Sequence, residues 1–188
     1  MTRNTFKLAF IGTHGVGKTT LCYGLAARLK ARDISLDIVG EVARRCPLPI
    51  NRDTTEEAQA WILHSQIAAE ILAASRHDMV ICDRSVLDNF VYLLLASGHT
   101  SPLDDLVSYW TSTYDLLIHV PIIEDLRPDG LRSTDPGFQY LVEERLRREI
   151  EERDLEILAL DDLNREEWVD RVERAAWEQL RPGQLELL

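Results

Sequence analysis

Short apolar runs alternate with longer amphipathic stretches along most of the chain. Five runs have the length and the aliphatic content of buried strands: Phe6–Ile11, Leu36–Val39, Met79–Cys82, Leu116–Val120 and Leu155–Leu160. Helical spacing or capping signals mark Lys18–Ala31, Thr54–Ser75, a stretch after Ser85 as far as Ala96, Leu103–Thr111, Tyr140–Arg153 and a final helix from Asn164 to about Leu180. Strands that alternate with helices form right-handed crossovers, so the pattern predicts an α/β fold. We expect a three-layer α/β/α sandwich around a five-stranded parallel sheet.

Residues suited to chemistry follow three of these strands. A glycine-rich segment, Gly12–Thr19, comes after the first strand, Glu41 comes after the second, and Asp83 and Arg84 come after the third. In open parallel sheets, ligands bind outside the carboxyl ends of the strands. We therefore expect these segments to meet in one site.

Length and composition narrow the choice of protein class. The 188 residues, 45% of them hydrophobic and 28% charged, are sufficient for a single globular domain spanning 1–188. The net charge of −11 disfavours nucleic acid or membrane surfaces as partners, because both repel a uniformly acidic protein. Three dispersed cysteines indicate neither a zinc site nor a disulfide framework, and no leader or membrane span is evident. A cytoplasmic protein is expected.

The segment Gly12-Thr13-His14-Gly15-Val16-Gly17-Lys18-Thr19 matches the phosphate-binding pattern GxxxxGK[ST] at every position. Glycines let consecutive backbone N–H groups turn inward around a phosphate, and the following helix adds its positive dipole end. Lys18 is expected to bridge the β- and γ-phosphates of ATP. The predicted nucleotide-binding residues are Gly12, Thr13, His14, Gly15, Val16, Gly17, Lys18, Thr19 and Thr20. His14 is expected to have a positional role.

A carboxylate is expected opposite this loop to complete the Mg²⁺ site. Asp83 ends the apolar run Met79–Cys82, where such a carboxylate is found in P-loop proteins, and the Thr19 hydroxyl is the second predicted Mg²⁺ ligand. The alternative for Asp83 is a helix N-cap. ATP and Mg²⁺ are therefore the predicted cofactors, with the preference for ATP over GTP left open.

Three functions are compatible with a P-loop: a small-molecule kinase, an ATPase, and a GTP-dependent switch. Motor ATPases usually carry a glutamate after the strand-end aspartate, whereas here Arg84 follows Asp83. A guanine-reading Asn-Lys-x-Asp string is missing from the sequence. The interpretation favours an ATP-dependent phosphotransferase acting on a small molecule, with an ATPase or regulatory switch as the alternative.

The order of motifs resembles a known family. Gly12–Thr19, Gly40–Arg44, Asp83–Ser85 and Asp129–Arg132 together resemble P-loop kinases related to the ribosylnicotinamide kinase domain of bacterial NAD-regulatory proteins, which are often labelled AAA-family ATPases. The Asp-Arg-Ser string is also similar to a motif of deoxynucleoside kinases. The resemblance implies a nucleoside- or nucleotide-kinase fold and a nucleoside-like acceptor.

The resemblance also implies roles for single residues. Glu41 would accept a proton from the attacking hydroxyl or orient it, although the choice between Glu41 and Asp83 as base stays open, and Arg44 or Arg45 are alternative partners of Glu41. Arg84 would contact phosphate or the base, with an ion pair to Asp83 or Asp88 as the alternative. The remaining candidates are Arg127 and Arg132 in a lid of about 125–148, and Trp61, His64, Gln66, Phe90 and Tyr92 around the acceptor. The oligomeric state is left open.

Overall fold

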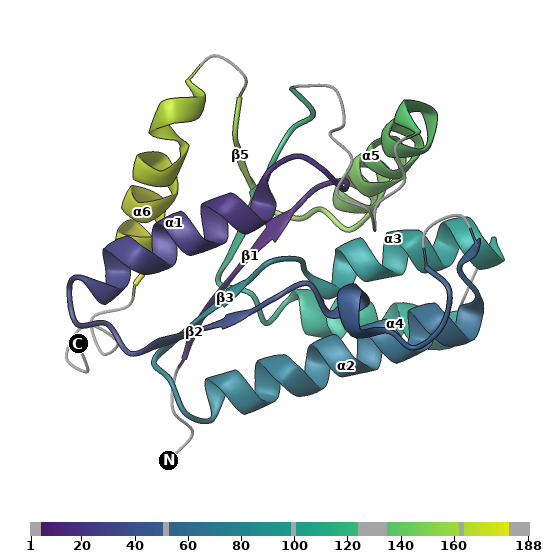
Figure 1. Ribbon diagram of the computed structural model, residues 1–188, viewed down its shortest axis with the longest axis horizontal. Helices are drawn as coiled ribbons and strands as arrows, with labels where there is room; N and C mark the ends of the chain where they lie inside the picture. The colour runs from purple at the N-terminus through teal and green to yellow at the C-terminus, as the bar shows by residue number, and fades with distance from the viewer. Residues whose placement is uncertain (1–4, 51–52, 99–100, 124–134, 162–163, 181–188) are drawn as a thin grey trace.

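The computed structural model describes residues 5–50, 53–98, 101–123, 135–161 and 164–180. Its centre is a parallel five-stranded sheet in the order β2-β3-β1-β4-β5 (Figure 1). The strands are β1 (Phe6–Ile11), β2 (Leu36–Val39), β3 (Met79–Cys82), β4 (Leu116–His119) and β5 (Leu158–Ala159). The predicted fold class, a parallel five-stranded α/β sandwich, is confirmed.

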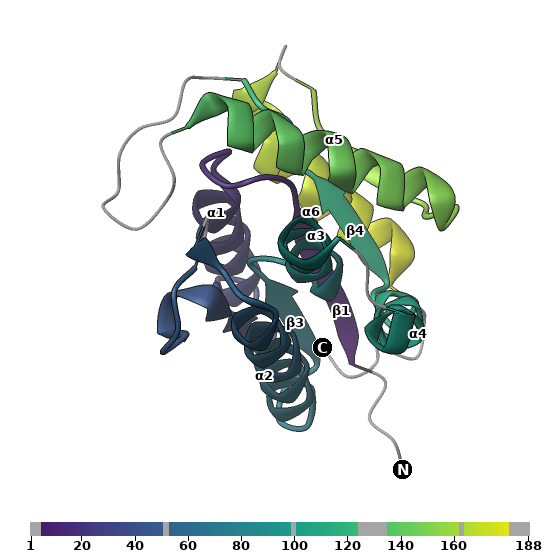
Figure 2. The same ribbon diagram turned by 90° about the vertical axis from the view of Figure 1, so that its right-hand side faces the viewer.

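Helices cover both faces of this sheet (Figures 1 and 2). Helices α1 (Lys18–Lys30) and α6 (Trp168–Gln179) pack on one face. On the other face lie α2 (Glu56–Ala74), α3 (Val86–Ser97), α4 (Ser101–Thr111) and α5 (Pro136–Glu152), with α3 packed against the other three. The described residues also include two short 3₁₀ turns, η1 (Val42–Arg45) and η3 (Arg165–Glu167).

The central strand β1 shows why the apolar runs are continuous. All six of its residues are buried. Phe6, Leu8 and Phe10 belong to the core beneath α1 and α6, while Ala9 and Ile11 belong to the core beneath α2 to α5. A strand covered on both faces needs apolar side chains at successive positions, unlike a half-exposed strand.

The edge strand β5 is shorter than the predicted Leu155–Leu160. It pairs with β4 only at two positions, Ile118↔Leu158 and His119↔Ala159. The backbone N–H of Leu155 still donates to the Ile150 carbonyl at the end of α5. The first residues of the apolar run therefore close the preceding helix instead of joining the sheet.

Side-chain caps place the starts of two helices at other residues than the sequence predicts. Thr55, not Thr54, caps α2, and its hydroxyl accepts from the Ala58 N–H at 3.2 Å. Helix α5 begins at Pro136, four residues before Tyr140, with the Asp135 carboxylate accepting from the Gly137 N–H at 2.9 Å. Proline suits the first helical position because its missing N–H would have no intrahelical acceptor there. Pro136 and Gly137 therefore belong to the helix, ahead of the predicted start at Tyr140.

The last helix also begins later than expected. Asn164 precedes the η3 turn and makes no side-chain cap, and α6 starts at Trp168. The Trp168 ring is buried against the α1 side of the sheet, which places the start of α6. Among the described residues, every helix is too short or too polar to cross a membrane.

Candidate functional site

The glycine-rich loop joins β1 to α1 and requires glycine for steric reasons. Gly12 has φ of 145°, and a Cβ on it would lie 2.6 Å from the Val120 carbonyl oxygen. Gly15 and Gly17 adopt φ of 82° and 94°, in the left-handed region that side chains disfavour. The loop therefore has the backbone form that the phosphate-binding pattern predicts, lying against the end of β4.

Lys18 is folded back onto this loop. Its ammonium group donates to the carbonyl oxygens of Gly12 at 2.8 Å and Thr13 at 2.6 Å. Burial, helped by the nearby Arg84 charge, lowers the pKa of Lys18 from 10.5 to about 8. The carboxylates of Asp88, Asp83 and Glu41 act in the opposite direction. A buried ammonium at the start of a helix is positioned to receive an anion.

Asp83 lies opposite the start of α1. The Thr19 hydroxyl donates to its Oδ2 at 2.6 Å, and burial raises the pKa of Asp83 above its ordinary value. The helix N-cap is not Asp83 but Ser85, whose hydroxyl accepts from the Leu87 and Asp88 N–H groups. The capping alternative for Asp83 is thus removed, and its carboxylate stays directed at Thr19.

Thr19 and Asp83 fit a Mg²⁺ ion. Both offer hard oxygen atoms, and Mg²⁺ typically binds one or two protein groups together with water and substrate phosphates. Within the described ranges, no cluster of three or more His, Cys, Asp or Glu side chains forms a metal cage. The donor set therefore suits a metal that arrives with a nucleotide.

Thr20, the last predicted nucleotide contact, lies exposed on the first turn of α1.

Asp88 links the phosphate loop to the Asp83–Ser85 turn. Its Oδ1 accepts from the Gly12 N–H at 3.0 Å, and its Oδ2 accepts from both the N–H and the hydroxyl of Ser85 at 2.8 Å. From the sequence, Asp88 was expected only as an alternative ion-pair partner of Arg84. The capping-box spacing of Ser85 and Asp88 was the available signal for its role at the helix start.

Glu41 and Arg84 form a buried ion pair. Glu41 Oε1 accepts from Arg84 Nε at 3.0 Å and lies 2.9 Å from Arg84 Nη2, and Arg44 Nε donates to Glu41 Oε2 at 2.8 Å. Burial opposes the charge of Arg84, but Glu41 and other acidic neighbours outweigh it, and the pKa of Arg84 rises above its ordinary value. Arg84 thus pairs with Glu41 rather than with either aspartate considered from the sequence.

Two pockets meet at this pair. One is lined by the phosphate loop from Gly15 to Lys18, together with Asp83. The other lies beside it and is lined by His14, Ala43, Arg44, Ile50, Gln59, Ile62, Asn89 and Tyr92. Among the described residues, Glu41 and Arg84 are common to both linings. A phosphate group in the first pocket and a ligand in the second would therefore face the same carboxylate and guanidinium.

His14 joins the loop to the neighbouring helices. Its Nδ1 lies 3.0 Å from the Tyr92 hydroxyl, and its ring packs with those of Tyr92 and Phe138 in a cluster of three. The side-chain amide of Gln139 donates to the His14 carbonyl at 2.8 Å, and the Thr13 hydroxyl donates to the Gln139 carbonyl at 3.1 Å. These contacts fit the positional role expected of His14, and they fix α5 to the phosphate loop.

The structure places the other candidates at different points. Trp61 and His64 lie at the surface of α2, and Gln66 is enclosed in the protein interior, so none of the three lines the pockets. Tyr92 lines the second pocket, whereas Phe90 lies under a separate groove beside α4 and α5. Arg127 and Arg132 lie outside the described residues. The part of the expected lid from residue 136 onward is α5.

Two pocket residues, Asn89 and Gln59, and a neighbouring arginine, Arg165, were missed in the sequence. Asn89 is 3% exposed, and its Nδ2 has no hydrogen-bond partner within the described part of the chain. Gln59 lines the same pocket, and Arg165 at η3 reaches within 3.8 Å of where a Cβ on Gly17 would stand. Helical spacing from Tyr92, three residues further along α3, could have suggested Asn89, but a position on η3 gives no sequence signal.

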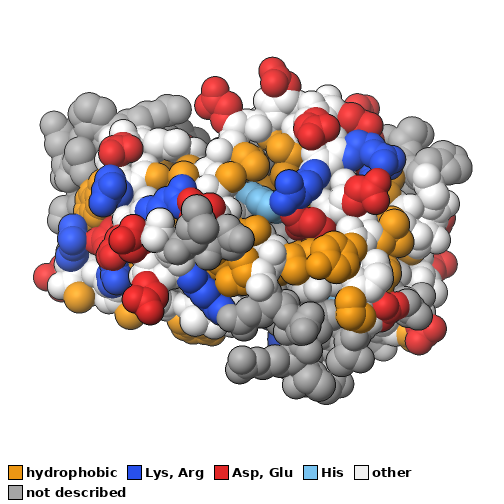
Figure 3. All heavy atoms as spheres, turned by 90° about the horizontal axis from the view of Figure 1, so that it is seen from above, with side chains coloured by type: hydrophobic (Ala, Val, Ile, Leu, Met, Phe, Trp, Pro, Cys, Tyr) orange, Lys and Arg blue, Asp and Glu red, His pale blue; other side chains and the backbone are white. Residues whose placement is uncertain are grey.

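The charged side chains around the site are of mixed sign. Figure 3 shows a face on which Lys and Arg side chains lie among acidic and hydrophobic ones, with no broad basic patch on that face. On α5, Arg148 pairs with Glu144 at 3.3 Å and Arg147 pairs with Glu143 at 2.8 Å, each one turn apart. Arg148 and Glu144 lie on the solvated face of α5, whereas the Glu143 carboxylate is buried and also lies 2.8 Å from His119 Nε2.

Comparison with known proteins identifies the family. A family model described as an AAA domain matches residues 7–171. A comparison with curated proteins finds no match.

Solved structures with the same fold include two of NadR. The complex of NadR with NR has a TM-score of 0.74 at 21% identity, over 93% of this chain and 53% of that one. The complex of NadR with NAD and AMP-PNP has a TM-score of 0.72 at 19% identity, over 95% and 52%. Deoxyadenosine kinase from M. mycoides with bound dATP has a TM-score of 0.65 at 14% identity, over 90% and 98%. The chain spans about half the length of NadR.

Three features of the structure agree with a P-loop fold: the phosphate loop between β1 and α1, the Thr19–Asp83 contact and the parallel sheet. The TM-scores of these structures establish the fold, and the family model covers most of the chain. The chain belongs to the AAA-domain family and has the α/β fold of P-loop kinases.

Proposed function

We propose that this protein transfers the γ-phosphoryl group of ATP to a hydroxyl group of a small nucleoside-like molecule. The observation that carries the proposal is the meeting of two pockets at Glu41 and Arg84. A simple ATPase needs room for a water molecule beside the phosphate loop. A kinase needs a second binding site whose ligand reaches the same point, and the second pocket supplies it.

The phosphate side of the site is assigned to the loop between β1 and α1. When ATP binds, the Lys18 ammonium exchanges its two carbonyl acceptors for phosphate oxygens. Thr19 and Asp83 would hold Mg²⁺, which neutralises phosphate charge when bound. Arg165 at η3 is placed to border the nucleotide beyond Gly17.

The acceptor side is assigned to the second pocket. Ala43, Ile50 and Ile62 give it apolar walls, and the Tyr92 ring lies beside them. The buried Asn89 Nδ2 offers a hydrogen-bond donor with no partner in the described residues. Apolar walls with one or two polar groups suit a flat, polar-edged ring such as a nucleobase or a nicotinamide.

At the junction, the chain can orient both reactants. Glu41 holds or accepts the proton of the attacking hydroxyl, while Arg84 meets the negative charge on the transferring phosphoryl group. Arg44 and Arg84 both donate to the Glu41 carboxylate and fix its position. A loose phosphoryl-transfer transition state needs little proton removal before bond breaking, so orientation by Glu41 is sufficient. Asp83 is the weaker candidate for base because Thr19 already occupies its Oδ2.

The relatives agree with this substrate class. NadR binds NR in one structure and NAD with AMP-PNP in another, and the M. mycoides enzyme is a deoxyadenosine kinase with bound dATP. Their ligands are nucleosides or nucleotides. The proposal takes from them only the chemical class of the acceptor, which the lining of the second pocket independently suits.

Acceptor-dependent ADP release tests the proposal. The protein with Mg·ATP would be screened against nucleosides, ribosylnicotinamide and nucleoside monophosphates. One acceptor should raise ADP release at least about tenfold above the rate without acceptor and should yield a phosphorylated product. Lys18→Ala should abolish this turnover, and Lys30→Ala, at the far end of α1, should not. ATP hydrolysis that is equally fast with every acceptor and with none would favour the ATPase alternative.

A further inference from the structure

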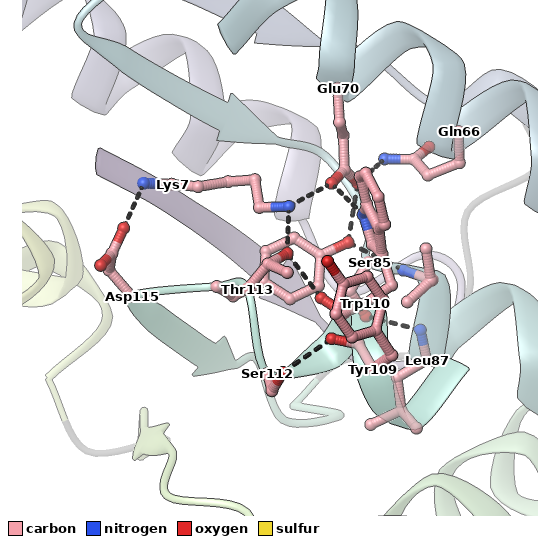
Figure 4. Close-up of polar contacts among 12 residues, drawn as sticks. Lys7, Gln66, Glu70, Ser85, Leu87, Tyr109, Trp110, Ser112, Thr113 and Asp115 are labelled. Carbon is pink, nitrogen blue, oxygen red and sulfur yellow. Dashed lines mark hydrogen bonds and ion pairs between the residues drawn. The ribbon is translucent and has the colours of Figure 1, made fainter. Parts of the chain in front are cut away.

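A buried carboxylate lies behind the Asp83–Ser85 turn, away from both pockets. The Glu70 side chain on α2 has 0% exposure, and Figure 4 shows Lys7, Gln66 and Trp110 directed toward it. Its Oε2 accepts from Lys7 Nζ at 2.8 Å and from Trp110 Nε1 at 2.7 Å. Its Oε1 accepts from Gln66 Nε2 at 2.9 Å and from the Tyr114 hydroxyl at 2.7 Å. A buried charge is tolerated only with such partners.

Two of these partners continue to the backbone of the turn. Gln66 Nε2 also donates to the Arg84 carbonyl at 3.1 Å. The Tyr114 hydroxyl accepts from the Val86 N–H at 3.1 Å. One carboxylate thus orients two side chains that hold the backbone on either side of Ser85.

The position of the turn backbone matters because the turn supports Arg84. The side chain of Arg84 extends from the turn to Glu41, where the two pockets meet. The carbonyl of Arg84 and the N–H of Val86 lie where β3 ends and α3 begins, outside the ladders of both elements. Buried backbone groups need partners, and a partner fixed by a charge has few alternative positions.

The Lys7 side chain anchors the other end of the network. Its ammonium group also donates to the Thr113 hydroxyl at 2.5 Å and lies 4.5 Å from the centre of the Trp110 ring. The N–H of Lys7 donates to Asp115 Oδ2 at 2.7 Å (Figure 4). Because Lys7 belongs to β1, the network ties the turn to the buried central strand of the sheet.

We infer that Glu70 is a positioning residue that acts through Gln66 and Tyr114 to hold the Arg84 guanidinium between the two pockets. The inference rests on the proposed function for its effect on catalysis. The placement of Arg84 itself is a property of the free protein and can be measured without substrate.

The first test measures hydrogen exchange at Arg84 Nε–H in the free protein by NMR. Gln66→Met removes the amide that joins Glu70 to the Arg84 carbonyl and keeps a side chain of similar length. Exchange should become about tenfold faster, because the guanidinium leaves Glu41 more often. Trp110→Phe is the matched control: it removes another donor to Glu70 but leaves both connections to the turn, and exchange should stay unchanged.

The second test measures kcat and KM with the acceptor that supports turnover. Gln66→Met should lower kcat about tenfold and leave the KM for ATP unchanged, because small misplacement of a transition-state contact costs rate. In an Arg84→Met background, Gln66→Met should have no further effect. If Gln66→Met does not fold, Tyr114→Phe replaces it in both tests.

Two results would overturn the inference: exchange that Gln66→Met does not change, or exchange and kcat effects that Trp110→Phe reproduces in full. A further loss of kcat when Gln66→Met is added to Arg84→Met would also contradict it. If the wild-type protein transfers phosphate to no acceptor, the proposed function fails, but the exchange measurement still decides whether Glu70 positions Arg84.

Discussion

The Glu41 carboxylate and the Arg84 guanidinium, 2.9 Å apart, join the ends of β2 and β3 at the point where two pockets meet. Neither residue is close to the other in sequence. The pair is nearly enclosed, with side-chain exposures of 9% and 6%. A buried charged pair at a junction of two pockets is better explained by chemistry than by stability, because desolvation offsets much of its Coulombic attraction.

Glu41→Gln should lower kcat by about a hundredfold and change ATP affinity little. The amide keeps the shape of the side chain but can neither accept the hydroxyl proton nor hold Arg84 as tightly. Steady-state kinetics and ATP titration measure the two effects. The matched control is Glu144→Gln on the exposed face of α5, which should behave as wild type. Turnover unaffected by Glu41→Gln would rule out the assigned role.

Asp83→Asn should raise the Mg²⁺ concentration needed for half-maximal turnover by about tenfold. Loss of the charge weakens metal binding, while the amide can still contact Thr19. Turnover measured against Mg²⁺ at fixed ATP checks the change, with Asp37→Asn on β2 as the control. If Asp83 were instead the base, kcat at saturating Mg²⁺ would fall as far as it does in Glu41→Gln.

ATP affinity should fall as pH rises above 8. Lys18 has a pKa of about 8 in the free protein, because burial and Arg84 oppose its charge. Bound phosphates favour the charged form and raise that pKa, so binding takes up a proton once the pH exceeds 8. The dissociation constant should then rise by up to about tenfold per pH unit, and stay level below 8.

Calorimetry in buffers of different ionisation enthalpy measures this proton uptake. Lys18→Arg keeps the charge without titrating and should remove the slope above pH 8. An unchanged slope in this variant would assign the pH dependence to another group.

Gly12→Ala should destabilise the protein by about 2 kcal/mol or more, because the new Cβ would stand 2.6 Å from the Val120 carbonyl oxygen. In a domain of this size that lowers Tm by about 5 °C. Gly40→Ala is the control: no atom lies within 4 Å of its Cβ position. Equal Tm values for the two variants would contradict the close approach seen at Gly12.

Asn89→Ala should raise the KM for the acceptor about tenfold and leave the KM for ATP unchanged. Its Nδ2 is buried, lines the second pocket and has no partner within the described residues. A lost hydrogen bond to a bound ring accounts for an effect of this size. Steady-state kinetics with both substrates provides the measurement. A rise in the KM for ATP instead would assign this pocket to the nucleotide.

The sequence alone determined the parallel α/β fold, the phosphate loop and the strand-end carboxylates, because these depend on local signals. Continuous apolar runs mark strands buried on both faces, and the spacing of glycines and Lys18 is fixed by the geometry of one loop. For the same reason, capping by Ser85 was open to sequence reasoning. Helix starts such as those at Thr55 and Pro136 were harder to predict from the sequence, because neighbouring residues offer competing caps.

Only the tertiary structure decided how distant residues are combined. It paired Arg84 with Glu41 instead of an aspartate, and it placed Gln66 behind the Asp83–Ser85 turn, away from the pocket lined by Tyr92. It also brought Asn89 to that pocket. Such contacts depend on how α2 and α3 pack on the sheet, and no periodicity within a single segment contains that information.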